Sequence, residues 1–142
     1  MKTLRIATAC FLNDAHALLV VRKRGTQAWM LPGGKLDGEE TPQQALLREL
    51  HEELALTLSA DALQPLGQFA APAANEADTQ VSAQVFCASL PAQQVPTIGA
   101  EIAAMQWIAL DAPLPAQVAP LLRSHIIPAL QARIAQAKAR SV

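Results

Sequence analysis

The chain contains few charged and few aromatic side chains, and it has no tyrosine. Charged residues make up 16% and aromatic residues 4% of its 142 positions, whereas hydrophobic residues make up 51%. About a quarter of an average soluble protein is charged, so this composition excludes intrinsic disorder as well as coiled-coil and collagen-like sequence. A chain of this length buries roughly two thirds of its unfolded surface and can fold without a disulfide or a metal. We therefore predict one globular domain over residues 1–142.

An excess of charge of either sign is also absent. Eleven lysines and arginines stand against twelve aspartates and glutamates, which gives a net charge of -1. Such a chain has no bulk attraction for nucleic acid or for an anionic membrane. No apolar run approaches the roughly 18 residues that a membrane span requires. We expect neither nucleic acid nor a membrane as a partner.

Cysteine is scarce. Cys10 and Cys87 both lie in apolar, strand-like runs and do not have the spacing of metal ligands. One interpretation of these cysteines is a disulfide or a nucleophile. The other is that they are two small buried side chains in a reducing compartment. Base rates for isolated thiols favour the second interpretation, so we expect a cytoplasmic protein.

Apolar runs indicate strands on both sides of a central helix. The predicted strands are residues 6–12, 17–21, 66–70, 81–90 and 103–110. Two glycines in Leu31-Pro32-Gly33-Gly34 indicate a tight bend, and the composition of residues 91–99 is typical of a loop. From Leu114 onward the apolar spacing is helical, with Pro120 and Pro128 expected to begin or kink helical segments. The order of elements predicts an α/β fold.

Thr41-Pro42-Gln43-Gln44 gives the strongest local prediction of a helix start. Threonine as the N-cap, proline at the first helical position and glutamine three residues after the cap form a capping box. The predicted helix covers residues 42–54. Its leucines at 46, 47, 50 and 54 share one face, which is wide enough to be buried.

Three glutamates share a second face of this helix. Glu49, Glu52 and Glu53 are spaced at i, i+3 and i+4, where like charges destabilise a helix by a few tenths of a kcal/mol per pair. A solvated acidic face is one interpretation. The other is a hard divalent cation, because Mg²⁺ and Mn²⁺ prefer carboxylate oxygens and often share them with substrate phosphates. No lysines are interleaved with these acids, and the helix follows a Gly-Gly bend, so we favour metal-assisted phosphate chemistry.

Residues 34–56 resemble the Nudix box. The family pattern is Gly, five residues, Glu, seven residues, Arg-Glu, an aliphatic residue, any residue, Glu-Glu, any residue, Gly and an aliphatic residue. The matching positions are Gly34, Glu40, Arg48, Glu49, Leu50, Glu52, Glu53 and Leu56. Ala55 replaces the second glycine, so either alanine adopts a left-handed conformation at a cost of about 1 kcal/mol or the helix continues by a residue. The resemblance implies the Nudix α/β/α sandwich, with a mixed sheet between the box helix and the C-terminal helix.

The resemblance also implies an enzyme, a hydrolase that uses Mg²⁺ or Mn²⁺ and an attacking water. Members of the family cleave a nucleoside diphosphate linked to another moiety. By this resemblance Glu49, Glu52 and Glu53 hold the metal, and the carbonyl of Gly33 is a further candidate ligand. Glu52 or Glu53 is a candidate for the base that takes the proton of the water.

Further roles follow from the same resemblance. Arg48 would orient the acids, and Glu40 would support the loop before the helix. Glu101 is a second candidate for the base, or else an ordinary loop acid. Arg22 would contact a phosphate, or else lie at a solvated strand end, and Gly34 would border the substrate.

Absent features narrow the choice of substrate. The missing tyrosine removes the signature of diadenosine-polyphosphate hydrolases, and the extra motifs of NADH-cleaving and coenzyme A-cleaving members are also missing. We expect a nucleoside triphosphate, including oxidised forms such as 8-oxo-dGTP, cleaved to a monophosphate and pyrophosphate. ADP-ribose or a nucleotide sugar is the alternative substrate. A non-catalytic nucleotide sensor is the alternative function. The family often forms homodimers, and nothing in the sequence identifies an interface.

Overall fold

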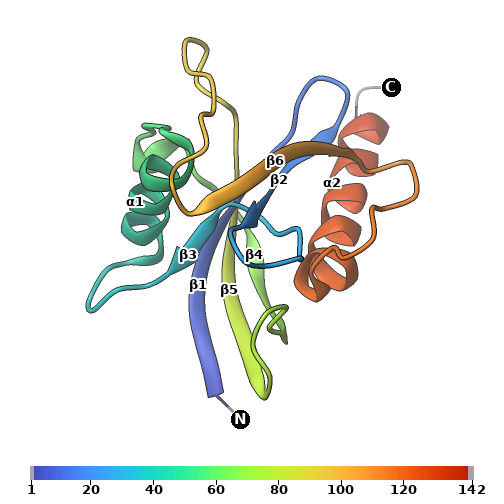
Figure 1. The fold of residues 1–142 in the computed structure, drawn as a ribbon. Coiled ribbons are helices and arrows are strands. Elements are labelled where there is room, and N and C mark those ends of the chain that lie inside the picture. The colour runs from blue at the N-terminus through green and yellow to red at the C-terminus, as the bar shows by residue number, and fades with distance from the viewer. Residues whose placement is uncertain (1, 141–142) are drawn as a thin grey trace.

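The computed structural model describes residues 2–140 and contains six strands and two longer helices (Figure 1). The elements are β1 (Lys2–Phe11), β2 (Ala17–Lys23), β3 (Gly33–Lys35), α1 (Pro42–Leu54), the 3₁₀ turn η1 (Ala60–Ala62), β4 (Gln64–Pro72), β5 (Thr79–Ala88), β6 (Ile102–Ala109), the π-helical turn η2 (Leu122–Ile126) and α2 (Ile127–Arg140). None of the helices in this part of the chain is long and apolar enough to cross a membrane.

A mixed four-stranded sheet forms the centre, in the order β3-β1-β5-β4. β1 pairs parallel with β5, while β3 and β4 pair antiparallel with their neighbours. β2 and β6 form a separate antiparallel pair. Figure 1 shows α1 and α2 on opposite sides of the strands. The predicted α/β sandwich with a mixed sheet between two helices is confirmed.

Two apolar cores lie on the two sides of the strands. Leu46, Leu50 and Leu54 of α1 are fully buried in one core, and Leu122, Ile126 and Leu130 near the C-terminus belong to the other. Alternation along β2 sends Leu18 and Val20 to the α2 side and Leu19 and Val21 to the α1 side. A strand buried on both faces reads as a continuous apolar run, which explains the sequence of β2.

Several strand bounds differ by one or two residues from the prediction, and the main differences lie at three places. β1 begins at Lys2 rather than at residue 6, because its polar first half pairs with β5. Gly33–Lys35 is a strand rather than only a bend. A Cβ atom on Gly33 would lie 2.2 Å from the carbonyl oxygen of Ala7, so only glycine allows this close pairing. The C-terminal helical stretch begins at Pro120 rather than at Leu114.

Both C-terminal prolines have the predicted effect. Pro120 is the first residue of the helical stretch, where its missing N–H costs nothing. Pro128 follows the π-helical turn, whose last bond runs from the N–H of Ile127 to the carbonyl of Leu122. Because proline clashes with the preceding turn of a regular α-helix, a widened turn before Pro128 lets the helix continue.

Candidate functional site

The α1 helix has well-defined ends. Thr41 Oγ1 accepts a hydrogen bond from the Gln44 N–H, and Gln44 Oε1 accepts one from the Thr41 N–H, which is the predicted capping box. At the other end Ala55 has φ 56° and ψ 33°, a left-handed conformation. The helix therefore ends at Leu54 and does not run on, and Ala55 adopts the strained conformation that glycine would tolerate better.

Arg48 forms hydrogen bonds with two acidic residues, Glu40 in the loop before α1 and Glu49 in α1. Its Nε and Nη2 donate to the two carboxylate oxygens of Glu40, at 2.8 and 2.9 Å, and its Nη1 donates to Glu49 at 2.9 Å. Nη2 also donates to the Lys35 carbonyl at 3.2 Å. The bond from Arg48 lowers the pKa of Glu40, and the carboxylates together raise the pKa of Arg48. Arg48 is thus a positioning residue that fixes Glu49 and anchors the loop before α1.

Gly34 leaves the space that Glu49 occupies. A Cβ atom at position 34 would lie 2.6 Å from the carboxylate carbon of Glu49, and 2.8 and 2.9 Å from its two oxygens. Any larger residue would therefore have to displace the carboxylate that Arg48 holds. The bend at Gly33–Gly34 and the acidic face of α1 meet at this point.

Glu53 is the most unusual carboxylate of the chain because it is only 3% exposed. Its Oε1 accepts the Gly33 N–H at 3.0 Å, while its Oε2 is buried without a hydrogen-bond partner. Lys23 Nζ approaches Oε2 only to 3.9 Å. Burial raises the pKa of Glu53 to about 7, against the bond from Gly33 and the charge of Lys23, and the charges of Glu49 and Glu101 raise it further.

The unpartnered oxygen of Glu53 suits a hard divalent cation. A buried carboxylate oxygen without a donor is costly, and a cation would stabilise it. Within residues 2–140, no three acidic, histidine or cysteine side chains converge into a ready metal centre, and the side chain of Glu52 is 58% exposed. Mg²⁺ usually takes one or two protein carboxylates and completes its shell with water and phosphate oxygens. Glu53 with Glu49 matches that requirement.

A loop before β6 donates hydrogen bonds to the C-terminal end of α1. The N–H groups of Thr97 and Gly99 donate to the carbonyls of Leu54 and Glu53, at 2.9 and 2.8 Å. A Cβ atom on Gly99 would lie 2.3 Å from the Glu52 carbonyl oxygen, so this close contact needs glycine. The loop brings Glu101 near enough to raise the pKa of Glu53.

The basic residues at the end of β2 face in two directions. Arg22 donates to the Thr26 carbonyl at 2.9 Å and lies over the ring of Trp29, 5.9 Å from its centre, so its guanidinium is engaged away from the acids. Lys23 instead faces Glu53. Regular alternation sends Arg22 and Lys23 to opposite faces, although the pairing of β2 with β6 shifts its register between these two residues. Lys23 lies beside Glu53 and is not among the residues that the sequence predicts for the site.

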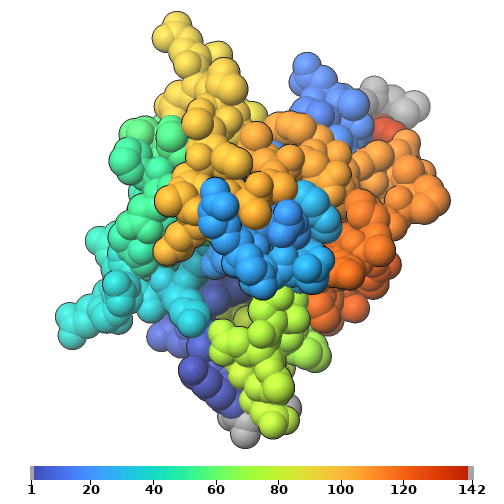
Figure 2. Space-filling model, viewed as in Figure 1, coloured from blue at the N-terminus to red at the C-terminus, as the bar shows by residue number. Residues whose placement is uncertain are grey.

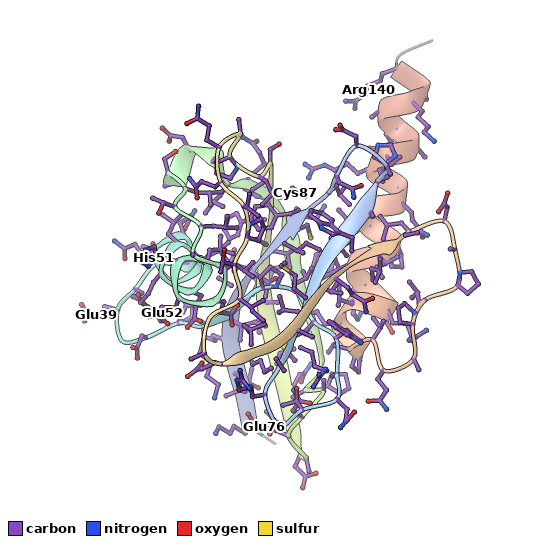
Figure 3. All side chains as sticks on the ribbon, turned by 45° about the horizontal axis from the view of Figure 1, so that its top comes forward. Glu39, His51, Glu52, Glu76, Cys87 and Arg140 are labelled. Carbon is purple, nitrogen blue, oxygen red and sulfur yellow. The ribbon has the colours of Figure 1, made fainter. Side chains whose placement is uncertain are left out.

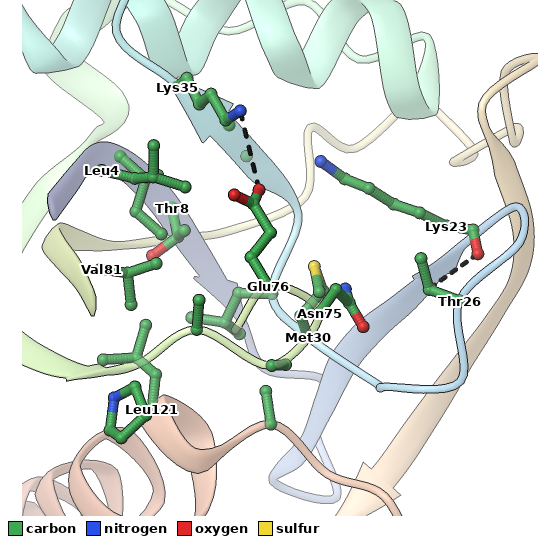
Figure 4. A pocket seen from close by; sticks show the side chains of 18 residues that line it. Leu4, Thr8, Lys23, Thr26, Met30, Lys35, Asn75, Glu76, Val81 and Leu121 are labelled. Carbon is green, nitrogen blue, oxygen red and sulfur yellow. Dashed lines mark hydrogen bonds and ion pairs between the residues drawn. The ribbon is translucent and has the colours of Figure 1, made fainter. Parts of the chain in front are cut away.

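A cavity of about 300 Å³ begins at the Gly33–Gly34 bend (Figure 4). It lies between β1 and the segment at residues 72–76, and Figure 2 shows a recess between that yellow-green segment and the blue loop before β3. Most of its lining is aliphatic, and none of the described lining side chains is aromatic. The polar lining side chains are Thr8, Lys23, Thr26, Lys35, Asn75 and Glu76.

Two of these polar groups stand out. Thr8 Oγ1 is buried without a hydrogen-bond partner, and the residue is only 4% exposed. Glu76 pairs with Lys35 at 3.9 Å across the cavity mouth, as Figure 4 shows. A buried hydroxyl without a partner in a cavity wall is available to a polar ligand. The cavity adjoins the carboxylates of α1 through β3, because Gly33 and Gly34 line the cavity and lie against Glu53 and Glu49.

Comparison with known proteins gives a consistent result. The NUDIX domain model matches residues 3–130. The 8-oxo-dGTP diphosphatase of Proteus vulgaris is 41% identical over 63 residues, 41% of this chain and 55% of that protein. The 8-oxo-dGTP diphosphatase of Escherichia coli (strain K12) is 40% identical over 62 residues, 40% of this chain and 47% of that protein. The chain thus spans about half the length of these curated relatives.

Solved structures extend the likeness to nearly the whole chain. The crystal structure of a MutT NUDIX hydrolase from Burkholderia pseudomallei has a TM-score of 0.71 at 25% identity, and the match covers 92% of this chain and 98% of that one. A MutT protein from Methanosarcina mazei Go1 has a TM-score of 0.70 at 19% identity and covers 96% of both chains. The second likeness concerns the fold alone.

Proposed function

This chain belongs to the NUDIX domain family, and on that basis we propose that it is a divalent-metal-dependent pyrophosphohydrolase. Its proposed substrate is a nucleoside triphosphate, including oxidised forms such as 8-oxo-dGTP. Water attacks the diphosphate, and the products are a nucleoside monophosphate and pyrophosphate. The observation that carries the proposal is that Lys23 and Gly33, which line a ligand-sized cavity, are also the residues that contact the buried carboxylate of Glu53.

We assign different roles to the carboxylates according to their surroundings. Glu53, Glu49 and Glu52 with the Gly33 carbonyl would hold Mg²⁺ or Mn²⁺, and Arg48 fixes the direction of Glu49. When bound, the metal would neutralise phosphate charge and lower the pKa of the attacking water. Exposed Glu52 and the loop residue Glu101 remain candidates for the base that takes the proton, together with Glu53.

The positions of the basic side chains favour Lys23 as the first contact for a phosphate, whereas the sequence suggests Arg22. Lys23 lines the cavity next to Glu53, so its ammonium is placed to meet a phosphate that reaches the carboxylates. Arg22 is engaged with Thr26 and Trp29, and contact with a phosphate would require it to leave both partners. We therefore assign the first phosphate contact to Lys23 and keep Arg22 as a second candidate.

The cavity favours a compact ligand with polar edges. Its aliphatic walls suit a flat base, and Thr8 and Asn75 offer polar groups to that base. The similarity to 8-oxo-dGTP diphosphatases supports a triphosphate over ADP-ribose or a nucleotide sugar. Shorter matches to RNA pyrophosphohydrolases, 44% identical over 45 residues, make an RNA substrate the useful comparison.

A product-release assay tests the proposal. The panel contains the common and 8-oxo nucleoside triphosphates, ADP-ribose, a nucleotide sugar and a 5′-triphosphorylated RNA oligonucleotide, each with Mg²⁺ or with a chelator. We expect metal-dependent release of pyrophosphate from a free triphosphate. Cleavage of ADP-ribose alone, to AMP and ribose 5-phosphate, would overturn the proposed substrate. Nucleotide binding without turnover of any compound would favour a sensor.

Matched variants connect that activity to the site. Glu53→Gln removes the proposed metal ligand, whereas Glu39→Gln changes an acid that lies at the outer end of the loop before α1 (Figure 3). We expect Glu39→Gln to retain the wild-type rate. Equal rates in the two variants would contradict the assignment of the site.

A further inference from the structure

The two cysteines lie side by side, although 76 residues separate them in the sequence. Cys10 of β1 and Cys87 of β5 are direct partners in the parallel register, and both belong to the core on the α2 side. Side chains at paired positions of neighbouring strands point to the same face of the sheet. The two thiols are close enough for each to shift the pKa of the other. The pair is therefore a close dithiol rather than two isolated thiols.

Arg133 of α2 completes this cluster. Its Nη1 donates to Cys87 Sγ at 3.2 Å. The bond from Cys10 and the charge and bond of Arg133 lower the pKa of Cys87 against the effect of its burial. The shared bond with Cys87 and burial raise the pKa of Cys10 well above the usual value. The contact with Arg133 therefore favours the thiolate form at Cys87 rather than at Cys10.

Cys87 is the more accessible of the two cysteines. Cys10 is 1% exposed, whereas Cys87 is partly exposed. Cys87 lines a surface depression together with Leu12, His16 and Arg133. Figure 3 shows Cys87 well away from Glu52 and Glu76, so this depression is separate from the proposed active site. An accessible thiolate beside a buried thiol is the arrangement of an attacking and a resolving cysteine.

We propose that Cys87 is an oxidation site for hydroperoxides and that Cys10 converts its product into an intramolecular disulfide. The Cys87 thiolate attacks the outer peroxide oxygen, an S–O bond forms, and the O–O bond breaks. The departing oxygen takes a proton to give water or an alcohol, and Cys87 becomes a sulfenic acid. The Cys10 sulfur then attacks Cys87, the S–S bond forms, and the hydroxyl leaves with the Cys10 proton as water. The two thiols lose two electrons and the peroxide gains them.

The strand geometry permits this bond. Neighbouring strands lie about 4.7–4.9 Å apart, and disulfides span Cα separations of about 4.4–6.8 Å. The two residues are exact partners in the register, so no strand has to slide. Arg133 also stays available to the sulfenic oxygen as a donor.

Mass spectrometry of the intact full-length chain tests the proposal. The protein is treated with hydrogen peroxide, then denatured in N-ethylmaleimide to label every remaining thiol. We expect wild type to lose both labels and two hydrogen atoms as a monomer. Cys10→Ser should instead accumulate a sulfenic acid on Cys87 that dimedone captures, and Cys87→Ser should keep its Cys10 thiol through the same treatment.

Arg133→Gln tests the role of the arginine, and Arg123→Gln is its control because that arginine bonds only a loop carbonyl at Pro115. The midpoint of the pH profile for Cys87 alkylation by iodoacetamide should rise by roughly one pH unit or more in Arg133→Gln. It should stay unchanged in Arg123→Gln. Two labelled thiols in peroxide-treated wild type would overturn the proposal, as would a disulfide between chains or a Cys87 sulfinic acid beside a free Cys10.

Discussion

The carboxylate of Glu53 is 3% exposed, and one of its oxygens has no hydrogen-bond donor. Burial raises its pKa to about 7 from the ordinary value of 4.5. Between these two values the folded chain binds the proton more tightly than the unfolded chain. The stability that this group contributes is therefore complete below about pH 4.5 and is lost as the pH rises to about 7. The buried charge of this proposed metal ligand therefore makes the metal-free fold less stable at neutral pH.

Glu53→Gln should separate stability from activity. Glutamine keeps an acceptor for the Gly33 N–H and removes the buried charge, so metal-free Glu53→Gln should be more stable than wild type at pH 8 by on the order of 1–3 kcal/mol. The gain should disappear below about pH 4.5. Turnover should fall at least about a hundredfold, because a proposed metal ligand is lost. Urea unfolding at several pH values and steady-state kinetics measure the two effects.

Glu52→Gln is the matched comparison. Its side chain is 58% exposed, so we expect the unfolding free energy to stay within about 0.5 kcal/mol of wild type. Its turnover should nevertheless fall at least about a hundredfold. A loss of stability at pH 8 in Glu53→Gln would contradict the account of the buried charge, and near-wild-type rates in both variants would remove the metal assignment.

At the scale of elements, α1 has a weak point at its C-terminal end. Ala55 adopts φ 56° and ψ 33°, where an alanine Cβ meets the backbone. Ala55→Gly should stabilise the protein by about 0.5–1 kcal/mol, after allowing for the larger entropy of glycine in the unfolded chain. Chemical denaturation measures the change. Ala45→Gly, at the buried fourth residue of the same helix, should destabilise the protein by at least about 1 kcal/mol. Stabilisation of both variants or of neither would refute the explanation.

The sequence predicts elements whose causes are local. The capping box at Thr41 and the apolar face of α1 lie within a few turns of one another, and the structure confirms both bounds of that helix. Pro120 and Pro128 act on their own turns in the same way. Such features can be predicted without knowing which elements pack against them.

Features that depend on distant pairing could not be read in this way. The strand at Gly33–Lys35 exists because β1 accepts it as an edge partner, and glycine has little strand propensity of its own. The approach of Cys10 to Cys87 follows from the parallel register of β1 and β5, which no local pattern encodes. The place of Lys23 beside Glu53 could not be predicted, because it depends on which face of β2 lies toward α1.

At the scale of the whole molecule, the metal and the nucleotide should depend on each other. Mg²⁺ usually takes one or two protein carboxylates and completes its shell with water and substrate phosphates, so we expect the α1 carboxylates to supply only part of the shell. The cavity ends beside Gly33 and Lys23, where phosphates of a bound nucleotide would supply the missing oxygens. Binding of either one should therefore strengthen binding of the other by the same factor.

Thermal unfolding can detect this coupling without turnover. The melting temperature is measured with Mg²⁺ alone, with a non-hydrolysable triphosphate analogue plus chelator, and with both together. A ligand that binds only the folded state at about 100 times its Kd adds about 2.7 kcal/mol, which for a domain of this size is a rise of several degrees. We expect the joint shift to exceed the sum of the separate shifts in wild type and to become merely additive in Glu53→Gln. Additive shifts in wild type would mean that metal and nucleotide bind at independent places, and the incomplete carboxylate shell would then need another explanation.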